Sequence, residues 1–222
     1  RLDLHLHTQF SHDCDTPLER IEAHALAASL TGLAVTDHNT IEGALRLRDR
    51  VSKLTVIVGE EISSRDGEII GLFLENPIRR GLSGIDTIHA IHSQNGLVYL
   101  PHPFDRSRVR KTGGASLSQV IALVDIVEVF NGKAGRDRHN TLAGEFASRH
   151  GKAGAGGSDA HSLRAIGSVY NEFETEDSLP SPAGLLAGLS KGITVGTRRS
   201  PLGGWLVRGR RPVTLMWNRF RR

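Results

Sequence analysis

The sequence predicts an α/β fold, either a doubly wound sheet or a closed barrel. Short apolar runs alternate with helix-like stretches along most of the chain, which is typical of a mostly parallel sheet. A chain of 222 residues is also long enough for one large domain with a substantial core. Polar residues follow several of the apolar runs, where the active sites of such folds are assembled.

The first predicted strand, Leu2–His7, alternates leucine with aspartate and histidine. Residues two apart share one face of a strand, so the three leucines can enter a core while the aspartate and both histidines point to the other side. Taken alone, this alternation is equally typical of a half-buried edge strand with a polar outer face. The rest of the chain must therefore decide whether this strand belongs to a functional site or to the edge of a sheet.

The remaining elements follow from apolar runs and capping signals. Six further strand-like runs are Leu33–Thr36, Leu54–Gly59, Glu68–Leu74, Leu97–Leu100, Asp125–Phe130 and Lys152–Gly156. The predicted helices are Thr16–Leu30, Asn39–Lys53, Ser83–Gly96, Arg136–Gly151 and Pro180–Ser190. In the first helix we expect Thr16 as the N-cap, Pro17 at the first helical position and Glu19 completing a capping box. The third and fourth helices are expected to end at glycine.

The composition is that of a soluble globular protein, with 38% hydrophobic and 23% charged residues and a mean hydropathy of −0.23. No apolar run approaches the roughly 20 residues that span a bilayer. The first residues also lack the basic and then apolar pattern of a signal peptide. The single cysteine, Cys14, excludes an internal disulfide and fits a reducing compartment, so we expect a cytoplasmic protein.

Positive charge is concentrated at the end of the chain. From Ile193 onward there are eight arginines and no acidic residue, which leaves 28 − 8 = 20 Lys and Arg against 24 Asp and Glu, a net charge of −4, in the preceding part. We therefore predict a main domain over residues 1–199 and a basic, partly apolar extension over residues 200–222 that holds both tryptophans. Docking of the extension on the acidic body is favoured over binding to nucleic acid or lipid.

Histidines and carboxylates gather where the strand-like runs end, in the first run LDLHLH and in the motifs TDHN, GEEIS, PHP and GSDAH. These residues are His5, His7, Asp37, His38, Glu60, Glu61, His102, Asp159 and His161. Imidazole and carboxylate together suit Zn²⁺, Mn²⁺ or Fe ions. Each motif alone is more simply interpreted as a cap or a turn, but their recurrence at successive strand ends favours a shared metal centre. Asp37 and His38 are adjacent and face apart, so one of them is expected to bind and the other to orient an imidazole.

The ordered motifs DLHLHT, TDHN, GEEIS, PHP and GSDAH, from Asp3 to His161, closely resemble the PHP family, named for polymerase and histidinol phosphatase. The resemblance implies a distorted (β/α)7 barrel with a trinuclear metal site at the C-terminal ends of its strands. It also implies hydrolysis of phosphoesters by a water that the metals activate. We expect two or three divalent ions per chain, with Zn, Mn and Fe as the candidates.

Carrying the family ligands onto this sequence gives nine candidate metal ligands. They are His5, His7, Asp13, His38, Glu61, Glu68, His102, Asp159 and His161, and all except Glu68 are also expected to be catalytic. Glu61, rather than Glu60, matches the family glutamate and is expected to bridge two metals. Glu68 departs from the pattern, because histidine is commoner at that position. Asn131 lies near the family site without a metal role.

The expected substrate is a phosphorylated small molecule or a nucleotide. Arg106 and Arg108 follow His102 closely, and we expect them to contact the phosphate, since Arg binds phosphate in a bidentate manner. Histidinol-phosphate phosphatase and 3′–5′ nuclease activities are alternatives within the family. A metal-stabilised binding module with an arginine-rich tail is the non-enzymatic alternative. Nucleic acid is a less favoured partner.

Overall fold

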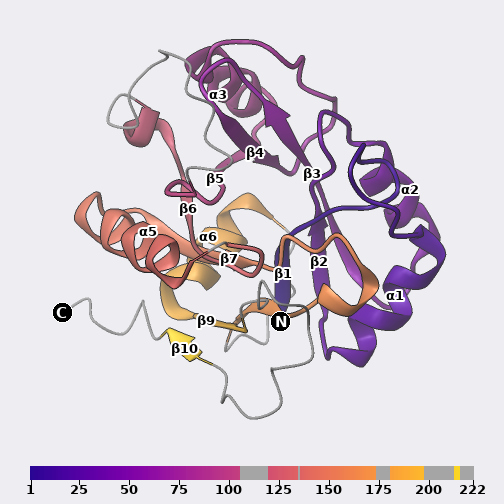
Figure 1. The fold of residues 1–222 in the computed structure, drawn as a ribbon. Helices are drawn as coiled ribbons and strands as arrows, with labels where there is room; N and C mark the ends of the chain where they lie inside the picture. The colour runs from indigo at the N-terminus through magenta and orange to yellow at the C-terminus, as the bar shows by residue number, and fades with distance from the viewer. Residues whose placement is uncertain (106–119, 135, 174–180, 198–212, 216–222) are drawn as a thin grey trace.

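The structure is a computed structural model that describes residues 1–105, 120–134, 136–173, 181–197 and 213–215 (Figure 1). In the described residues the strands are Leu2–Leu6 (β1), Gly32–Val35 (β2), Thr55–Ser63 (β3), Glu68–Leu72 (β4), Leu97–Leu100 (β5), Ile126–Asn131 (β6), Ala153–Gly157 (β7), Val169–Glu172 (β8), Ile193–Gly196 (β9) and Val213–Leu215 (β10). The α-helices are Leu18–Ala27 (α1), Glu42–Arg50 (α2), Gly84–His92 (α3), Asp137–Arg149 (α5) and Pro182–Lys191 (α6). No helix in the described part is long and apolar enough to cross a membrane.

The strands form one sheet in the order β10-β9-β8-β1-β2-β3-β4-β5-β6-β7, and this sheet curls into a nearly closed barrel. Strands β1, β2, β3, β5, β6 and β7 run in one direction, while β4 is antiparallel to both of its neighbours. The backbone of β1 also bonds to the segment that directly follows β7. The Asp159 N–H donates to the His5 carbonyl at 2.8 Å, and the His7 N–H donates to the Ala160 carbonyl at 3.0 Å. The predicted α/β barrel is therefore confirmed.

The barrel is not a regular repeat of seven β/α units. Strand β4 follows β3 through residues 64–67 with no helix between them, so this part of the ring is a hairpin. Because β4 runs opposite to its neighbours, its first residue lies at the rim where the parallel strands end. This reversal brings Glu68 to the same rim as the ends of β1, β2, β3, β5 and β7.

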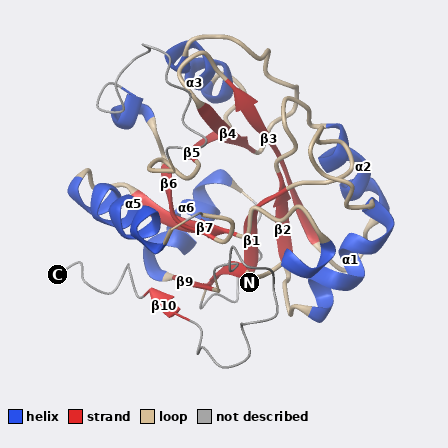
Figure 2. Ribbon diagram, in the orientation of Figure 1, coloured by secondary structure: helices blue, strands red, loops and turns tan. Residues whose placement is uncertain are grey.

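Two apolar clusters hold the barrel together. The inner cluster takes residues from strands β1 to β7 and two leucines of α6, Leu185 and Leu189. The outer cluster packs helices α1, α2, α3 and α5 against the strands, as Figure 2 shows around the outside of the ring. Burial of both clusters stabilises the barrel.

Strand β1 departs from the predicted alternation. Its register with β2 shifts between Asp3 and Leu6, so Leu6 packs in the outer cluster while Leu2 and Leu4 pack in the inner one. Asp3 does not join the histidines, because its carboxylate accepts hydrogen bonds from the backbone N–H groups of Ser158 and Gly167. The prediction of one shared polar face is therefore wrong for Asp3, which ties β1 to the segment after β7.

Some element ends also differ from prediction. Helix α1 begins at Leu18, and Thr16 is not its N-cap: the position is held by Pro17 without a side-chain cap bond, and the Thr16 hydroxyl accepts from the Cys14 thiol at 3.2 Å. Helix α2 begins at Glu42, because Asn39 adopts a positive φ of 57° and its side chain accepts from the Ser63 N–H. Strands β8 to β10 were not predicted from the sequence.

Most of the C-terminal extension and its predicted boundary at residue 199 lie outside the described residues. Within it, β10 pairs antiparallel with β9 along three residues. The prediction that residues 1–199 form one domain stays a prediction.

Candidate metal centre

The rim of the barrel gathers all nine side chains that the sequence singled out as candidate ligands. They come from the ends of β1, β2, β3, β5 and β7, from the start of β4 and from the loop after β1. The ligand atoms of the residues other than Asp159 form overlapping groups, and within each group these atoms lie within 4.8 Å of one another. Asp159 adjoins these groups, with its Oδ1 3.5 Å from His7 Nε2. Parallel strands end on one face of the barrel, which is why residues far apart in sequence meet here.

Glu61 lies at the middle of this cluster. Its Oε2 atom lies 3.5 Å from His5 Nε2, 3.3 Å from His7 Nε2 and 3.4 Å from His38 Nδ1. Its Oε1 atom faces the other way and lies 3.1 Å from His102 Nε2. Glu68 approaches from that side, 3.8 Å from His102 Nε2. The two oxygens of one carboxylate therefore face two different sets of nitrogen donors.

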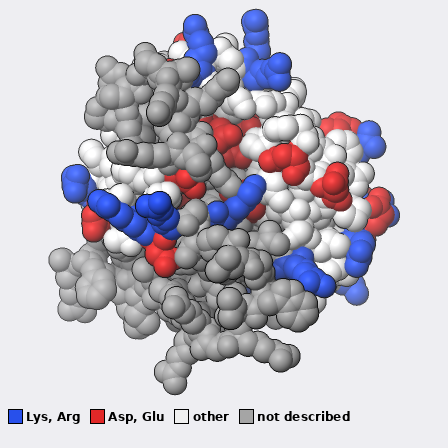
Figure 3. Space-filling view, viewed as in Figure 1, with Lys and Arg blue, Asp and Glu red and all other residues white. Residues whose placement is uncertain are grey.

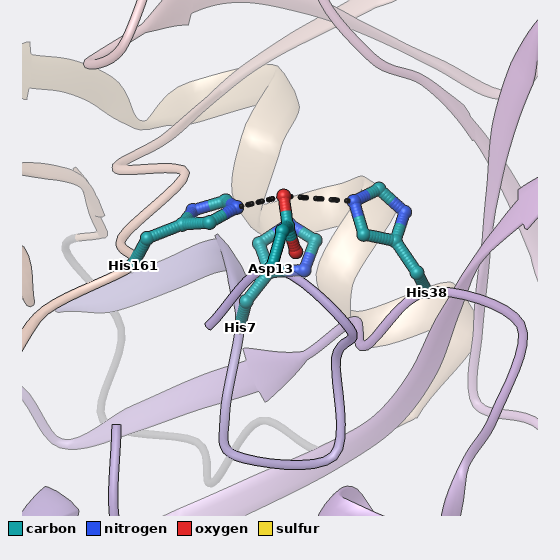
Figure 4. A group of neighbouring side chains, drawn as sticks. All are labelled: His7, Asp13, His38 and His161. Carbon is teal, nitrogen blue, oxygen red and sulfur yellow. Dashed lines mark hydrogen bonds and ion pairs between the residues drawn. The ribbon is translucent and has the colours of Figure 1, made fainter. Parts of the chain in front are cut away.

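A further group of donors lies at the edge of the cluster and consists of His7, Asp13, His38 and His161 (Figure 4). Asp13 Oδ2 stands between two imidazoles, 2.9 Å from His161 Nε2 and 3.7 Å from His38 Nε2. Asp13 is more exposed than the histidines around it, with 38% of its side chain accessible. This group therefore opens toward solvent, whereas the group around His5 is buried.

The donor set fits divalent cations. His5 Nε2 and His7 Nε2 are 3.2 Å apart, and both nitrogens face the carboxylate of Glu61. His38 Nδ1 is buried and makes no hydrogen bond in the described part of the structure. Ring nitrogens and carboxylate oxygens that converge in this way suit Zn²⁺, Mn²⁺ or Fe ions. The residues present therefore match a centre for such ions.

Opposed charges dominate the buried half of the centre. Burial lowers the pKa of His5, but the carboxylates of Glu128, Asp159 and Glu61 outweigh it and raise that pKa well above its usual value. For His102, burial also lowers the pKa, and Glu61 more than compensates to raise it. Burial raises the pKa of Glu61, yet the surrounding histidines hold it well below its usual value. Glu61 is thus an anion in an environment built for positive charge.

The two imidazoles beside Asp13 behave differently. Burial lowers the pKa of His38 to about 4, with a smaller contribution from His7. Burial and the neighbouring His7 also lower the pKa of His161. Near neutral pH both rings are therefore neutral and keep a lone pair, which is the form that binds a metal ion.

Outer contacts orient two of these rings. His7 Nδ1 lies 3.0 Å from Ser11 Oγ, and that hydroxyl donates to Asp37 Oδ1 at 2.9 Å. Asp37 is therefore the predicted orienting partner of TDHN, but it acts on His7 through Ser11 and not on its neighbour His38. His161 Nδ1 lies 3.0 Å from the Asp159 carbonyl. In both rings Nδ1 faces an acceptor, which leaves Nε2 pointing into the cluster.

Glu60, the neighbour that sequence analysis set aside, lies apart from the centre. Adjacent residues of a strand face opposite ways, and Glu60 accepts the Ile78 N–H at 2.7 Å instead of meeting the histidines. Burial raises the pKa of Glu60 to about 7.

Sequence reasoning missed Lys133, which follows β6 directly. Its Nζ lies 2.9 Å from His161 Nε2 and 3.9 Å from Asp159 Oδ1. Figure 3 shows acidic and basic side chains next to one another near the middle of this face. The predicted phosphate contacts Arg106 and Arg108 lie outside the described residues. A lysine after a strand end is a signal that the sequence did offer, in the stretch NGK.

Three comparisons identify relatives of the chain. The family model for the PHP domain matches residues 3–132, and a model described as PHP-associated matches residues 137–194. An uncharacterized protein of Methanocaldococcus jannaschii is 33% identical over 177 residues, which cover 78% of this chain and 70% of that protein.

Solved structures share the fold at low sequence identity. A two-domain protein of Bacteroides vulgatus that contains a predicted PHP-like metal-dependent phosphoesterase has a TM-score of 0.72 at 17% identity. The match covers 88% of this chain but 64% of that one, so the chain spans less than two thirds of its length. An amidohydrolase of Chromobacterium violaceum, solved with bound sulfate and no metal, has a TM-score of 0.58 at 16% identity, covering 81% of this chain and 92% of that one.

Proposed function

The chain belongs to the PHP family of metal-dependent hydrolases, and from this premise we propose that it hydrolyses phosphate esters of a small molecule or nucleotide at the barrel rim. The domain responsible is proposed to cover residues 1–199. The observation that carries the proposal is the position of Glu61, whose Oε2 faces three histidines while its Oε1 faces His102. This arrangement is what a carboxylate that bridges two cations requires.

In this proposal the nine residues divide into three groups, each of which would bind one metal ion. His5, His7 and Asp159 would hold one ion with Glu61, and His102 and Glu68 would hold a second ion on the other side of that carboxylate. Asp13, His38 and His161 would hold a third. Zn, Mn and Fe suit such nitrogen and oxygen donors. When bound, such ions supply an activated water at neutral pH and polarise the phosphoryl oxygens.

The side chains around the centre would bind and orient the substrate phosphate. Lys133 places a positive charge beside His161, at the solvent side of the cluster. Its ammonium suits a phosphate oxygen as a point charge. Arg106 and Arg108 remain proposed phosphate contacts. A tetrahedral oxyanion also accompanies the related fold from Chromobacterium violaceum, which was solved with sulfate.

The test is metal analysis of the purified chain followed by a phosphate-release screen. The screen covers nucleotides, sugar phosphates, histidinol phosphate and short oligonucleotides, each with and without added Mn²⁺ or Zn²⁺. Glu60→Gln is the matched control for Glu61→Gln, because the two residues are adjacent and only Glu61 lies in the centre. We expect two or three metal ions per chain and release of phosphate that Glu61→Gln abolishes and Glu60→Gln keeps. Release that survives both Glu61→Gln and chelation would contradict the proposal.

A further inference from the structure

Glu128, on β6, has a buried carboxyl group next to the metal centre and is not one of the nine candidate ligands. Glu128 is 1% exposed, and its carboxylate oxygens lie within hydrogen-bond distance of four groups. Oε1 lies 2.9 Å from His5 Nδ1 and 3.2 Å from the Tyr99 hydroxyl. Oε2 accepts from the His102 N–H at 2.7 Å and from Asn131 Nδ2 at 2.9 Å.

Four neighbours use the whole accepting capacity of this carboxylate. Each carboxylate oxygen offers about two lone-pair directions, and each oxygen of Glu128 already has two partners. Glu128 lies close enough to His5 and His102 to share an ion with them. It has no lone pair left for that purpose, so its contacts are those of an orienting group and not of a ligand.

We propose that Glu128 is a positioning residue that keeps the proton of His5 on Nδ1 and thereby presents the lone pair of Nε2 to the metal. His5 Nε2 is the nitrogen that lies 3.5 Å from Glu61 and 3.9 Å from Asp159. The same carboxylate holds the backbone of His102, so it aligns ligands from two strands at once. The inference rests on the metal centre of the proposed function and is independent of the substrate.

Substitution of Glu128 by glutamine separates this role from simple packing, because the two side chains have nearly the same shape. The His102 N–H can only donate, so the amide oxygen of glutamine must stay on that side. Asn131 has the same constraint: its Nδ2 also donates to Asp159 at 3.1 Å, and its Oδ1 accepts the Lys133 N–H at 2.9 Å. The glutamine NH₂ then faces His5 Nδ1, which must accept. This moves the ring proton to Nε2, where it blocks metal binding.

The experiment uses the full chain labelled with ¹⁵N and zinc as the probe ion. Ring ¹H–¹⁵N correlation spectra report which nitrogen of His5 carries the proton, with zinc removed by a chelator and again with zinc restored. His5→Gln identifies the His5 signals. Zinc affinity is measured in parallel by competition with a chelating dye. Tyr99→Phe is the control, because it removes one donor to Glu128 and leaves the contact with His5 in place.

We expect the wild-type chain and Tyr99→Phe to keep the His5 proton on Nδ1 and to bind zinc equally within about threefold. Glu128→Gln should show the proton on Nε2 and bind zinc about 10- to 100-fold more weakly, the range typical for loss of an outer-contact residue. In the wild-type chain, a neutral His5 ring with its proton on Nε2 and none on Nδ1 would overturn the inference even if Glu128→Gln does not fold. Unchanged zinc affinity in a folded Glu128→Gln chain would also overturn it. A wild-type chain that binds no zinc at all would instead overturn the proposed function.

Discussion

Replacing Glu60 with glutamine should remove a pH dependence from the free energy of unfolding. The Glu60 side chain is buried, its Oε2 accepts the Ile78 N–H, and its Oε1 has no hydrogen-bond partner in the described part of the structure. Burial raises its pKa from 4.5 to about 7. Above pH 4.5 the unfolded chain releases this proton, while the folded chain holds it until about pH 7. The folded state therefore loses stability between these two pH values and loses no more above them.

The shift of about 2.5 pKa units corresponds to roughly 3 kcal/mol in total, of which about 2 kcal/mol falls between about pH 5.5 and pH 8.5. Glutamine stays neutral throughout. The stability of Glu60→Gln relative to wild type should thus rise by about 2 kcal/mol over that range. Urea unfolding of both proteins with a chelator present measures this difference, because contributions from the histidines cancel between them. A difference that stays constant with pH would refute the reasoning.

Three further predictions concern the site and the chain around it. Asp159→Ala should abolish phosphate release while the circular dichroism spectrum stays that of the wild type, because the substitution removes a proposed ligand and not a residue of the apolar core; turnover by the metal-depleted variant would be contrary evidence. Gly43→Ala in α2 should lower stability by up to about 2 kcal/mol in urea unfolding, because overpacking costs about 1–3 kcal/mol and the gain in helix propensity is only about 1 kcal/mol. The added Cβ would run into the carboxylate of Asp37, so a more stable variant would contradict this contact. Truncation after Gly203 removes the strand that pairs with β9 and should lower the melting temperature while zinc binding is kept; an unchanged melting temperature would contradict docking of the extension.

Seven of the nine candidate ligands could be singled out from the sequence because they lie where a strand-like run ends, whereas Asp13 and Glu68 rest on the family resemblance. Parallel strands of a barrel end at a common rim, so residues as distant in sequence as His5 and Asp159 are expected to meet there. The family resemblance favoured Glu61 over Glu60, and the alternation of β3 explains why the two side chains face opposite ways. For these residues local sequence pattern and global fold agree.

Other features depend on contacts that the local sequence does not encode. The register shift in β1 accompanies hydrogen bonds from His7 to Ala160 and from Asp159 to His5, more than 150 residues along the chain. Glu128 resembles an ordinary polar position in a strand, and its role depends on donors from three other elements. Glu68 reaches the rim only because β4 is reversed. The cap expected at Thr16 is absent for a local reason, because its hydroxyl accepts from the thiol of Cys14, two residues earlier.

The most direct test of the metal centre is anomalous diffraction from crystals of the chain grown with Zn²⁺ or Mn²⁺, recorded at the absorption edge of the metal. The account predicts two or three peaks at the barrel rim, with Glu61 between two of them and His5, His7 and Asp159 in contact. Glu60 and Glu128 should touch none of the ions. An absence of peaks at the rim, or a peak bound by Glu128 in place of Glu61, would contradict the account.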